Sequence, residues 1–260
     1  MPILKLDGAD IYYEVTNPDG KKVVTLVNGH TRSSSDFRMM ARILGEAGFC
    51  VIILDNRAAG KSEAARPFTI TDMCNDVVAL WDHLKVKSSS LLGISMGGFI
   101  SQGIAINFPD RVEKLTLVST APEEKYINPT GGGWINEGSK LEDKLRSYFA
   151  PGFVERNPVL FKTMVAQIRL SISSGNFSER SDLQRAALKN AGWSARLSEI
   201  RSDTLIIHGA KDLVIDQEGA LLLRDSVPHA RLEIIPEAGH LLLAEAPREL
   251  YRLALDFLSK

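Results

Sequence analysis

The chain of 260 residues is 44% hydrophobic and 24% charged, and its formal net charge at pH 7 is −1. These values are typical of a globular protein, and the length fits one domain, or one core that carries an insertion. A nearly neutral chain lacks the electrostatic attraction that brings basic proteins to nucleic acid or to acidic membranes, so a small-molecule substrate is favoured.

Neither the cysteines nor the N-terminal residues indicate a metal-binding or exported protein. Cys50 and Cys74 belong to no Cys-x-x-Cys pair, so both are expected to be small core residues or free thiols. The N-terminal segment lacks a basic stretch followed by an apolar one, and no apolar run approaches the roughly 18 residues that span a bilayer. We expect a cytoplasmic protein without a membrane span, either a monomer or a homodimer.

Eight short segments have the pattern of β-strands. Residues 3–6 and 11–15 resemble a hairpin with its turn at Asp7 and Gly8. The other six are almost continuously apolar, which is typical of strands buried on both faces of a parallel sheet: residues 23–27, 50–54, 90–94, 115–118, 204–207 and 232–235. Between these runs, apolar residues recur at helical spacing, as expected of crossover helices. The pattern predicts an α/β protein with a mostly parallel eight-stranded sheet flanked by helices.

One long stretch, residues 122–198, interrupts this alternation. It contains no convincing strand, a Gly-Gly-Gly segment at 131–133, and several helical patterns, for example over residues 159–171. Long insertions at strand ends often become lids over a site. We therefore expect a core formed by residues 1–121 and 199–260, with 122–198 inserted as a helical cap.

Residues 93–97 read Gly-Ile-Ser-Met-Gly and match the pattern G-x-S-x-G. The motif follows an apolar run and precedes a helical one, which is the context that this nucleophile turn requires. Small neighbours allow a sharp, strained turn that exposes Ser95 at the carboxyl end of the strand, where the backbone N–H of Met96 can help to hold an oxyanion. The alternative is a glycine-rich turn with an incidental serine.

A nucleophilic serine needs a base, and the base needs an orienting acid. His240 follows the last apolar run and Asp212 follows the run before it, so both are expected at the sheet edge where Ser95 emerges. His30 is the main rival for the base. Asp216 lies near Asp212 but is better placed as the N-cap of the next helix.

At this point the sequence resembles the α/β-hydrolase superfamily over essentially its whole length. Residues 55–62, Asp-Asn-Arg-Ala-Ala-Gly-Lys-Ser, resemble the family's D-x-R-G-x-G-x-S loop, with Ala58 in place of a glycine. Residues 108–112 and 115–119 are similar to its helix-to-strand segment, and residues 244–247 to the segment beyond its histidine. The Ser-Met-Gly-Gly turn is similar to that of enol-lactone hydrolases, small esterases and cofactor-free haloperoxidase-like members.

The resemblance implies a second oxyanion donor in the loop after the third strand. That loop usually carries His-Gly, whereas residues 27–31 read Val-Asn-Gly-His-Thr, with Asn28 in place of the histidine. By alignment the donor would be the backbone N–H of His30. The ring of His30 could either face the pocket and contact substrate or fold over the loop.

These residues predict a hydrolase of a small carboxylic ester or lactone that forms an acyl-enzyme on Ser95 and needs no metal or organic cofactor. Four aromatic residues of the insertion are candidates to line its pocket, with simple packing as the alternative for each: Trp134, Phe149, Phe153 and Trp193. A serine at position 95 argues against relatives with a carboxylate nucleophile. A thioesterase, a carbon–carbon bond hydrolase, a perhydrolase, or a ligand receptor that retains the triad all stay open.

Overall fold

The computed structural model describes residues 2–128, 141–173, 176–189 and 191–260. Its sheet has the strand order β1-β2-β4-β3-β6-β7-β8-β9, with the short β5 paired to β2. The strands are β1 (Ile3–Leu6), β2 (Ala9–Thr16), β3 (Lys22–Val27), β4 (Phe49–Leu54), β5 (Glu63–Ala64), β6 (Ser89–Ile94), β7 (Val112–Val118), β8 (Asp203–Gly209) and β9 (Arg231–Ile235). All eight predicted strands are present, and β5 adds a two-residue ninth.

The direction of the strands follows their apolar patterns. The N-terminal hairpin pairs antiparallel within itself and with β4. From β4 to β9 every pairing is parallel. The central strands β4 and β6 are buried along nearly their whole length, because helices cover both faces of the sheet. The α/β class and the mostly parallel sheet are therefore confirmed.

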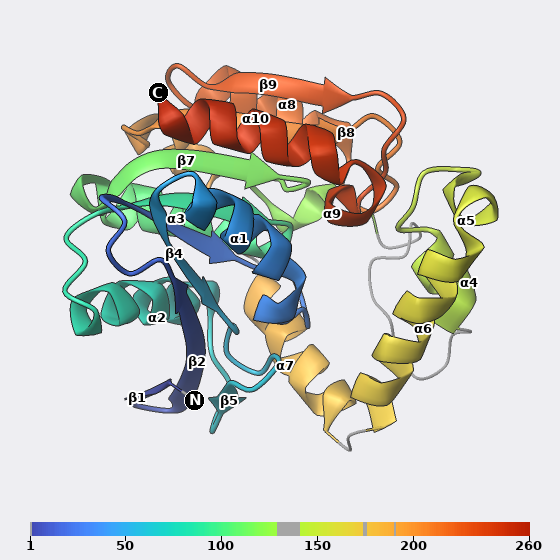
Figure 1. Ribbon diagram of the computed structural model, residues 1–260, viewed down its shortest axis with the longest axis horizontal. Coiled ribbons are helices and arrows are strands. Elements are labelled where there is room, and N and C mark those ends of the chain that lie inside the picture. Colours follow the sequence, from blue (N-terminus) through green and yellow to red (C-terminus); the bar gives the residue numbers. More distant parts are fainter. Residues whose placement is uncertain (1, 129–140, 174–175, 190) are drawn as a thin grey trace.

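Two layers of helices enclose the sheet (Figure 1). Apolar side chains of α1 and α10 pack on one face, and those of α2, α3 and α8 on the other. The bounds are α1 (Arg38–Glu46), α2 (Ile70–His83), α3 (Met96–Asn107), α8 (Gln217–Ser226), α9 (Leu242–Glu245) and α10 (Pro247–Ser259), with short 3-10 helices η1 (Ser34–Phe37), η2 (Pro109–Arg111), η3 (Glu124–Tyr126) and η4 (Ser194–Glu199). Asp216 caps α8 as expected, accepting a bond from the Glu218 N–H at 3.0 Å.

The described residues between β7 and β8 form a separate group of helices, called here the helical insertion: α4 (Leu141–Arg146), α5 (Phe153–Arg156), α6 (Pro158–Ser173) and α7 (Phe177–Leu188). In Figure 1, α4, α5 and α6 lie on the side toward which the arrowheads of β7 and β9 point, and α7 lies nearer the core. It has its own apolar cluster, in which Phe149 stacks on Phe153 and meets Phe161 edge-on. No helix in the described part of the chain has the length and apolar character needed to cross a membrane.

Candidate active site

The turn between β6 and α3 holds Ser95 in a strained conformation, with φ +54° and ψ −120°. The turn requires glycine two residues before and two residues after Ser95. A Cβ on Gly97 would lie 2.1 Å from the Val27 carbonyl oxygen, and one on Gly93 would lie 2.3 Å from the Gly97 carbonyl oxygen. The Ser95 N–H donates to the Val118 carbonyl at 2.9 Å, which anchors the turn to β7. Such a strained residue is a marker of a functional position.

Three side chains that lie far apart in the sequence meet at this turn. His240 Nε2 lies 3.2 Å from Ser95 Oγ, and His240 Nδ1 lies 2.9 Å from Asp212 Oδ2. Asp212 and His240 come from loops that follow β8 and β9, so the parallel order of the strands brings them to one edge of the sheet. With Nδ1–H donated to the carboxylate, Nε2 is left to accept the serine proton.

The Asp212 carboxylate is buried yet remains an anion at neutral pH. Burial alone would raise its pKa, but the attraction and hydrogen bond of His240 and backbone N–H donors lower it below the usual value. Its Oδ1 accepts the N–H groups of Val214 and Ile215 at 2.8 and 2.9 Å. His208 also approaches Oδ2, at 3.8 Å, and burial lowers its pKa, which favours the neutral ring. Asp212 is therefore fixed in orientation as well as in charge.

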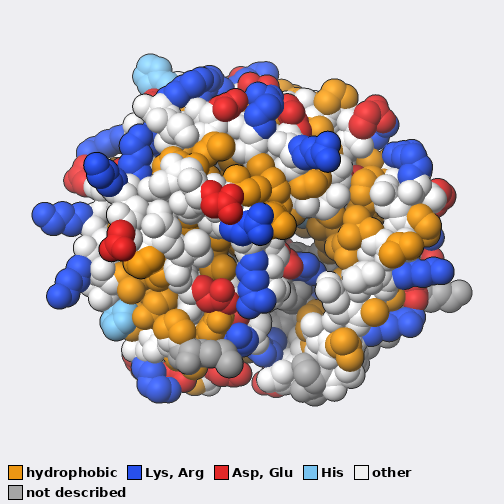
Figure 2. Space-filling model, in the orientation of Figure 1, with side chains coloured by type: hydrophobic (Ala, Val, Ile, Leu, Met, Phe, Trp, Pro, Cys, Tyr) orange, Lys and Arg blue, Asp and Glu red, His pale blue; other side chains and the backbone are white. Residues whose placement is uncertain are grey.

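A pocket of about 340 Å³ opens directly above Ser95 and His240. The surface is hollowed where the helical insertion meets the core (Figure 2). Most of the lining is apolar, and both the core and the helical insertion contribute to it. The apolar lining includes Met96, Phe99, Leu145, Leu160, Met164, Ile168, Phe177, Leu188, Val214 and Ile215. Pockets of this size and character bind small molecules.

The two residues predicted to hold an oxyanion through their backbone both belong to the pocket lining. Met96 is the first residue of α3, where amide groups lack partners within the helix. His30 lies in the loop after β3, close to the serine: a Cβ on its neighbour Gly29 would lie 3.8 Å from Ser95 Oγ. The neighbouring N–H groups are donated elsewhere: Gly29 to Asn28 Oδ1 at 2.8 Å and Thr31 to Gln184 Oε1 at 2.6 Å.

Asn28, which stands where the resembled family usually has histidine, holds this loop in shape. The Asn28 Nδ2 donates to the Ser33 carbonyl at 2.7 Å, and the backbone carbonyl of Asn28 accepts a bond from Asn56 Nδ2 at 2.8 Å. Together with the bond to Gly29, these contacts use both ends of the side-chain amide. The amide therefore fixes the loop that presents His30 to the pocket.

The ring of His30 contacts the helical insertion. Its Nε2 lies 3.0 Å from the carbonyl oxygen of Ser181 on α7, the geometry of a donated N–H bond. Burial under α7 is the largest influence on its pKa, which falls to about 4, so the ring is neutral at pH 7. The ring that lies within hydrogen-bond distance of Ser95 Oγ is that of His240, at 3.2 Å, whereas the ring of His30 is held by α7.

Three of the four aromatic residues predicted to line the pocket lie elsewhere. Phe149 and Phe153 pack against each other in the apolar cluster of the insertion, at 5.2 Å between ring centroids. The ring of Trp193 packs against Gly103 of α3, and its Nε1 donates to the Phe99 carbonyl at 2.9 Å. None of these three is among the residues that line the pocket. Trp134 lies outside the described residues.

Several residues of the site carried no signal in the sequence. Tyr148 lines the pocket and meets the His240 ring edge-on, at 5.7 Å between centroids. Its backbone carbonyl accepts the His240 N–H at 2.9 Å, and burial raises the pKa of its hydroxyl. Glu245 accepts three N–H bonds around the same loop. The contact of Tyr148 with His240 and the bond of Glu245 to Ala150 join residues far apart in the chain, so local patterns could not reveal them.

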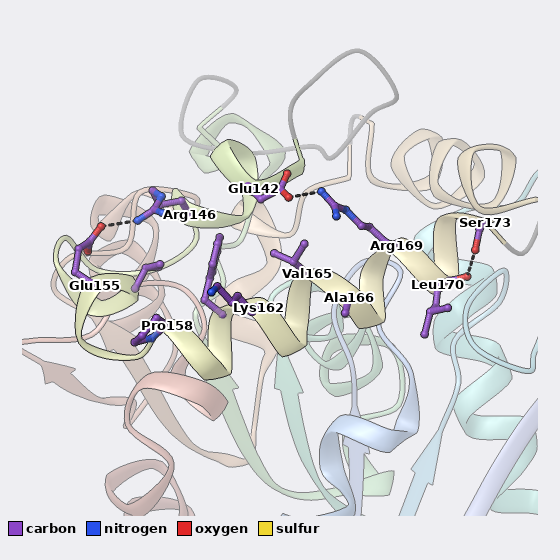
Figure 3. A pocket seen from close by; sticks show the side chains of 12 residues that line it. Glu142, Arg146, Glu155, Pro158, Lys162, Val165, Ala166, Arg169, Leu170 and Ser173 are labelled. Carbon is purple, nitrogen blue, oxygen red and sulfur yellow. Dashed lines mark hydrogen bonds and ion pairs between the residues drawn. The ribbon is translucent and has the colours of Figure 1, made fainter.

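A second hollow, of about 880 Å³, lies on the other side of α6 and shares no lining residue with the pocket above Ser95. In Figure 3 its sides carry the ion pairs of Arg146 with Glu155 and of Arg169 with Glu142. Helix α6 therefore has one face toward Ser95 and another toward this hollow. Within the described parts of the chain, no three His, Cys, Asp or Glu side chains are grouped as a metal site would require.

A family model described as the alpha/beta hydrolase fold matches residues 22–247. The chain belongs to this family. It is 29% identical over 206 residues to 3-oxoadipate enol-lactonase 2 of Acinetobacter baylyi, covering 77% of this chain and 75% of that protein. It is also 28% identical over 234 residues to 2-hydroxy-6-oxo-6-phenylhexa-2,4-dienoate hydrolase of Comamonas testosteroni, covering 82% and 78% of the two chains.

Solved structures show the same fold. The enol-lactonase from Burkholderia xenovorans LB400 matches over 100% of both chains with a TM-score of 0.86 and 24% identity. At this identity the likeness concerns the fold alone. The family resemblance drawn from the motifs, including its similarity to enol-lactone hydrolases, is confirmed, and the protein is a member of a hydrolase family.

Proposed function

We propose that this protein hydrolyses a small carboxylic ester or lactone, with Ser95 as the nucleophile, His240 as the base and Asp212 as the orienting acid. The observation that carries the proposal is the chain of contacts Ser95 Oγ–His240 Nε2–His240 Nδ1–Asp212 Oδ2, at 3.2 and 2.9 Å, at the base of the 340 Å³ pocket. Further support comes from two relatives whose names denote hydrolysis, an enol-lactonase and a dienoate hydrolase.

In the proposed reaction His240 Nε2 takes the proton of Ser95 as Oγ bonds to the substrate carbonyl carbon. The carbonyl oxygen becomes an oxyanion, which the backbone N–H groups of Met96 and His30 would hold; each such donor is worth about 3 kcal/mol of barrier. His240 then protonates the leaving alkoxide, and the acyl group stays on Ser95. Water that gives its proton to His240 releases the acid and restores the serine.

The helical insertion would act as a cap in this reaction. We assign residues 122–198 to it, with the core formed by 1–121 and 199–260. The support is that α4, α6 and α7 supply much of the apolar lining of the pocket. A cap of this kind excludes water from the acyl-enzyme and shapes the acyl pocket.

The test is multiple-turnover hydrolysis of p-nitrophenyl esters of increasing acyl length, with Ser95→Ala as the comparison. Loss of the nucleophile is expected to lower kcat by at least about 10⁴-fold. A Ser101→Ala variant, which changes a serine of the helix that follows Ser95, is expected to keep its activity and is the control for a serine-to-alanine change as such. Equal turnover by the wild type and Ser95→Ala would remove Ser95 from the mechanism.

A second candidate is hydrolysis of a carbon–carbon bond, which the relative from Comamonas testosteroni favours by its name. The same three side chains would serve it, since a vinylogous diketone also presents a carbonyl to the serine turn. Parallel assays with an enol-lactone and a 2-hydroxy-6-oxo-dienoate separate the two reactions. The substrate with the higher kcat/KM identifies the function.

A further inference from the structure

The pocket above Ser95 contains one complete ion pair. Arg32 Nε and Nη2 donate to the two carboxylate oxygens of Asp36 at 2.6 and 2.7 Å, and both residues line the pocket. Arg32 lies in the loop after β3, and Asp36 lies in η1 four residues later. Two parallel bonds of this type fix the plane of the guanidinium, and the carboxylate that receives them neutralises its charge.

The loop holds this pair in place from both sides. The backbone N–H of Arg32 donates to the Gly29 carbonyl at 3.3 Å, and Asn28 Nδ2 approaches Asp36 Oδ2 at 3.3 Å. The side chains are 36% and 19% exposed, so the pair is only partly open to solvent. A pair this constrained does not release its arginine to an incoming ligand without breaking two short bonds.

No other cation compensates for Asp36. Among the described residues that line the pocket, Arg32 is the only Lys or Arg and Asp36 the only Asp or Glu. His30 is neutral at pH 7 because burial lowers its pKa to about 4. Asp212, which lies behind His240, adds a negative charge. The formal charge of the described residues around the pocket is therefore zero or negative, and their walls are otherwise mostly apolar.

We propose that the Arg32–Asp36 pair makes this pocket select esters or lactones whose acyl part is uncharged and disfavour those that carry a second carboxylate. The inference rests on the proposed function and names its substrate class. A carboxylate buried in an apolar pocket needs a cation that is not already paired, and the energetic cost is several kcal/mol without one. An uncharged acyl chain has no such need and gains from the apolar lining.

Arg180 is the nearest rival for a carboxylate. It lines a neighbouring hollow of about 510 Å³, which shares Arg32 and Asp36 with the pocket but does not include Ser95. Its guanidinium donates to the carbonyl oxygens of Gly60 and Ser62. The guanidinium of Arg180 is therefore bound to these two carbonyl oxygens, and Arg180 is not among the residues that line the pocket above Ser95.

The first test compares two esters of similar length, p-nitrophenyl pentanoate and the mono-p-nitrophenyl ester of glutaric acid. The wild type is expected to prefer the uncharged ester by at least roughly 100-fold in kcat/KM. Asp36→Asn keeps the shape of the side chain but leaves Arg32 without its anion, and should shift the ratio toward the charged ester by at least about tenfold. Arg32→Gln should shift the ratio the other way, because it leaves Asp36 unpaired.

Arg180→Gln is the control, since it removes a charge of the same type outside the pocket and should leave the ratio within about twofold. The proposal is overturned if the wild type cleaves both esters equally well, or if Asp36→Asn leaves the ratio unchanged.

A binding measurement separates this proposal from the proposed function. Calorimetry on Ser95→Ala compares pentananilide with glutaranilic acid, the uncleaved counterparts of the two esters. Tighter binding of the uncharged anilide, with a preference that becomes at least about tenfold smaller in Ser95→Ala/Asp36→Asn, supports the proposal even if no ester is turned over. Equal binding overturns the charge selection while leaving ester hydrolysis to its own assay.

Discussion

His30 connects protonation of a single ring to the stability of the molecule. Its pKa, near 6.5 when exposed, falls to about 4 under α7, with Asp182 and Arg185 as the charged groups nearby. Between these values the unfolded chain binds a proton that the folded chain does not, so stability falls as the pH is lowered from 6.5 to 4. The loss from this group approaches about 3 kcal/mol at pH 4 and is absent above pH 7.

Urea unfolding at pH 7.0 and 4.5 measures this contribution. The wild type should lose about 2 to 3 kcal/mol more than His30→Asn between the two values. His208 and Asp212, whose pKa values are also lowered, titrate in both proteins and cancel in the difference. An equal loss in both proteins would show that the ring is accessible to protons in the folded state.

A residue of the candidate site could be predicted from the sequence where its position follows from the end of a predicted strand. Ser95, Asp212 and His240 each come directly after an apolar run, and the carboxyl ends of parallel strands meet at one edge. The aromatic residues of the insertion had no such constraint. Apolar size alone does not tell pocket lining from packing, and Phe149 and Trp193 pack.

At the scale of elements, the short helix α9 ties the loop of His240 to the insertion. The Glu245 carboxylate accepts the N–H groups of Ala150 at 2.8 Å, Gly239 at 3.1 Å and Leu241 at 3.2 Å. Burial raises its pKa, and the three N–H donors oppose that rise. Residues on both sides of His240 thus share one acceptor, so we infer that Glu245 positions the imidazole without touching substrate.

Glu245→Ala should leave these three buried N–H groups without their acceptor, at a cost of about 1 to 3 kcal/mol for each one that water does not reach. We expect kcat to fall at least about tenfold with a smaller change in KM, because the base is misplaced while the acyl pocket remains. Glu245→Gln, which keeps an acceptor oxygen, should recover part of kcat. A purely structural role predicts instead lower stability with an unchanged kcat for the folded fraction.

Helices and strands could be predicted where a local sequence pattern determines them, but the long-range contacts between them could not. The apolar runs place β3, β4 and β6 to β9, and helical spacing places α6 within a few residues of its bounds, because both patterns are local. The family loop at residues 55–62 was recognisable, but its contact with α7 was not. In that contact, Gln184 Nε2 donates to the Arg57 carbonyl, 127 residues away in the chain. No local sequence pattern indicates that the Gln184 side chain has this partner.

On the scale of the whole molecule, α7 is the element that joins the insertion to the loop after β3, which carries His30. Gln184 is fully buried at the junction, where its Oε1 accepts the Thr31 N–H at 2.6 Å and its Nε2 donates to the Arg57 carbonyl at 2.6 Å. The bond between His30 and Ser181 lies on the same helix. The insertion and the core are thus coupled at the loop that presents a proposed oxyanion donor.

Gln184→Leu has a similar volume but satisfies neither backbone group, so it should weaken this junction by about 2 to 4 kcal/mol. Because the junction is local, we expect faster hydrogen exchange in α7 and in residues 29–32 while α2 keeps its protection. kcat/KM for a neutral ester should fall at least about tenfold, since the loop that carries the proposed oxyanion donor His30 loses its hydrogen bond to Gln184. Glu179→Gln, on the exposed side of α7, is the matched control. Uniformly faster exchange across the sheet would instead mean that Gln184 stabilises the whole fold, and that the insertion and the core do not separate as units.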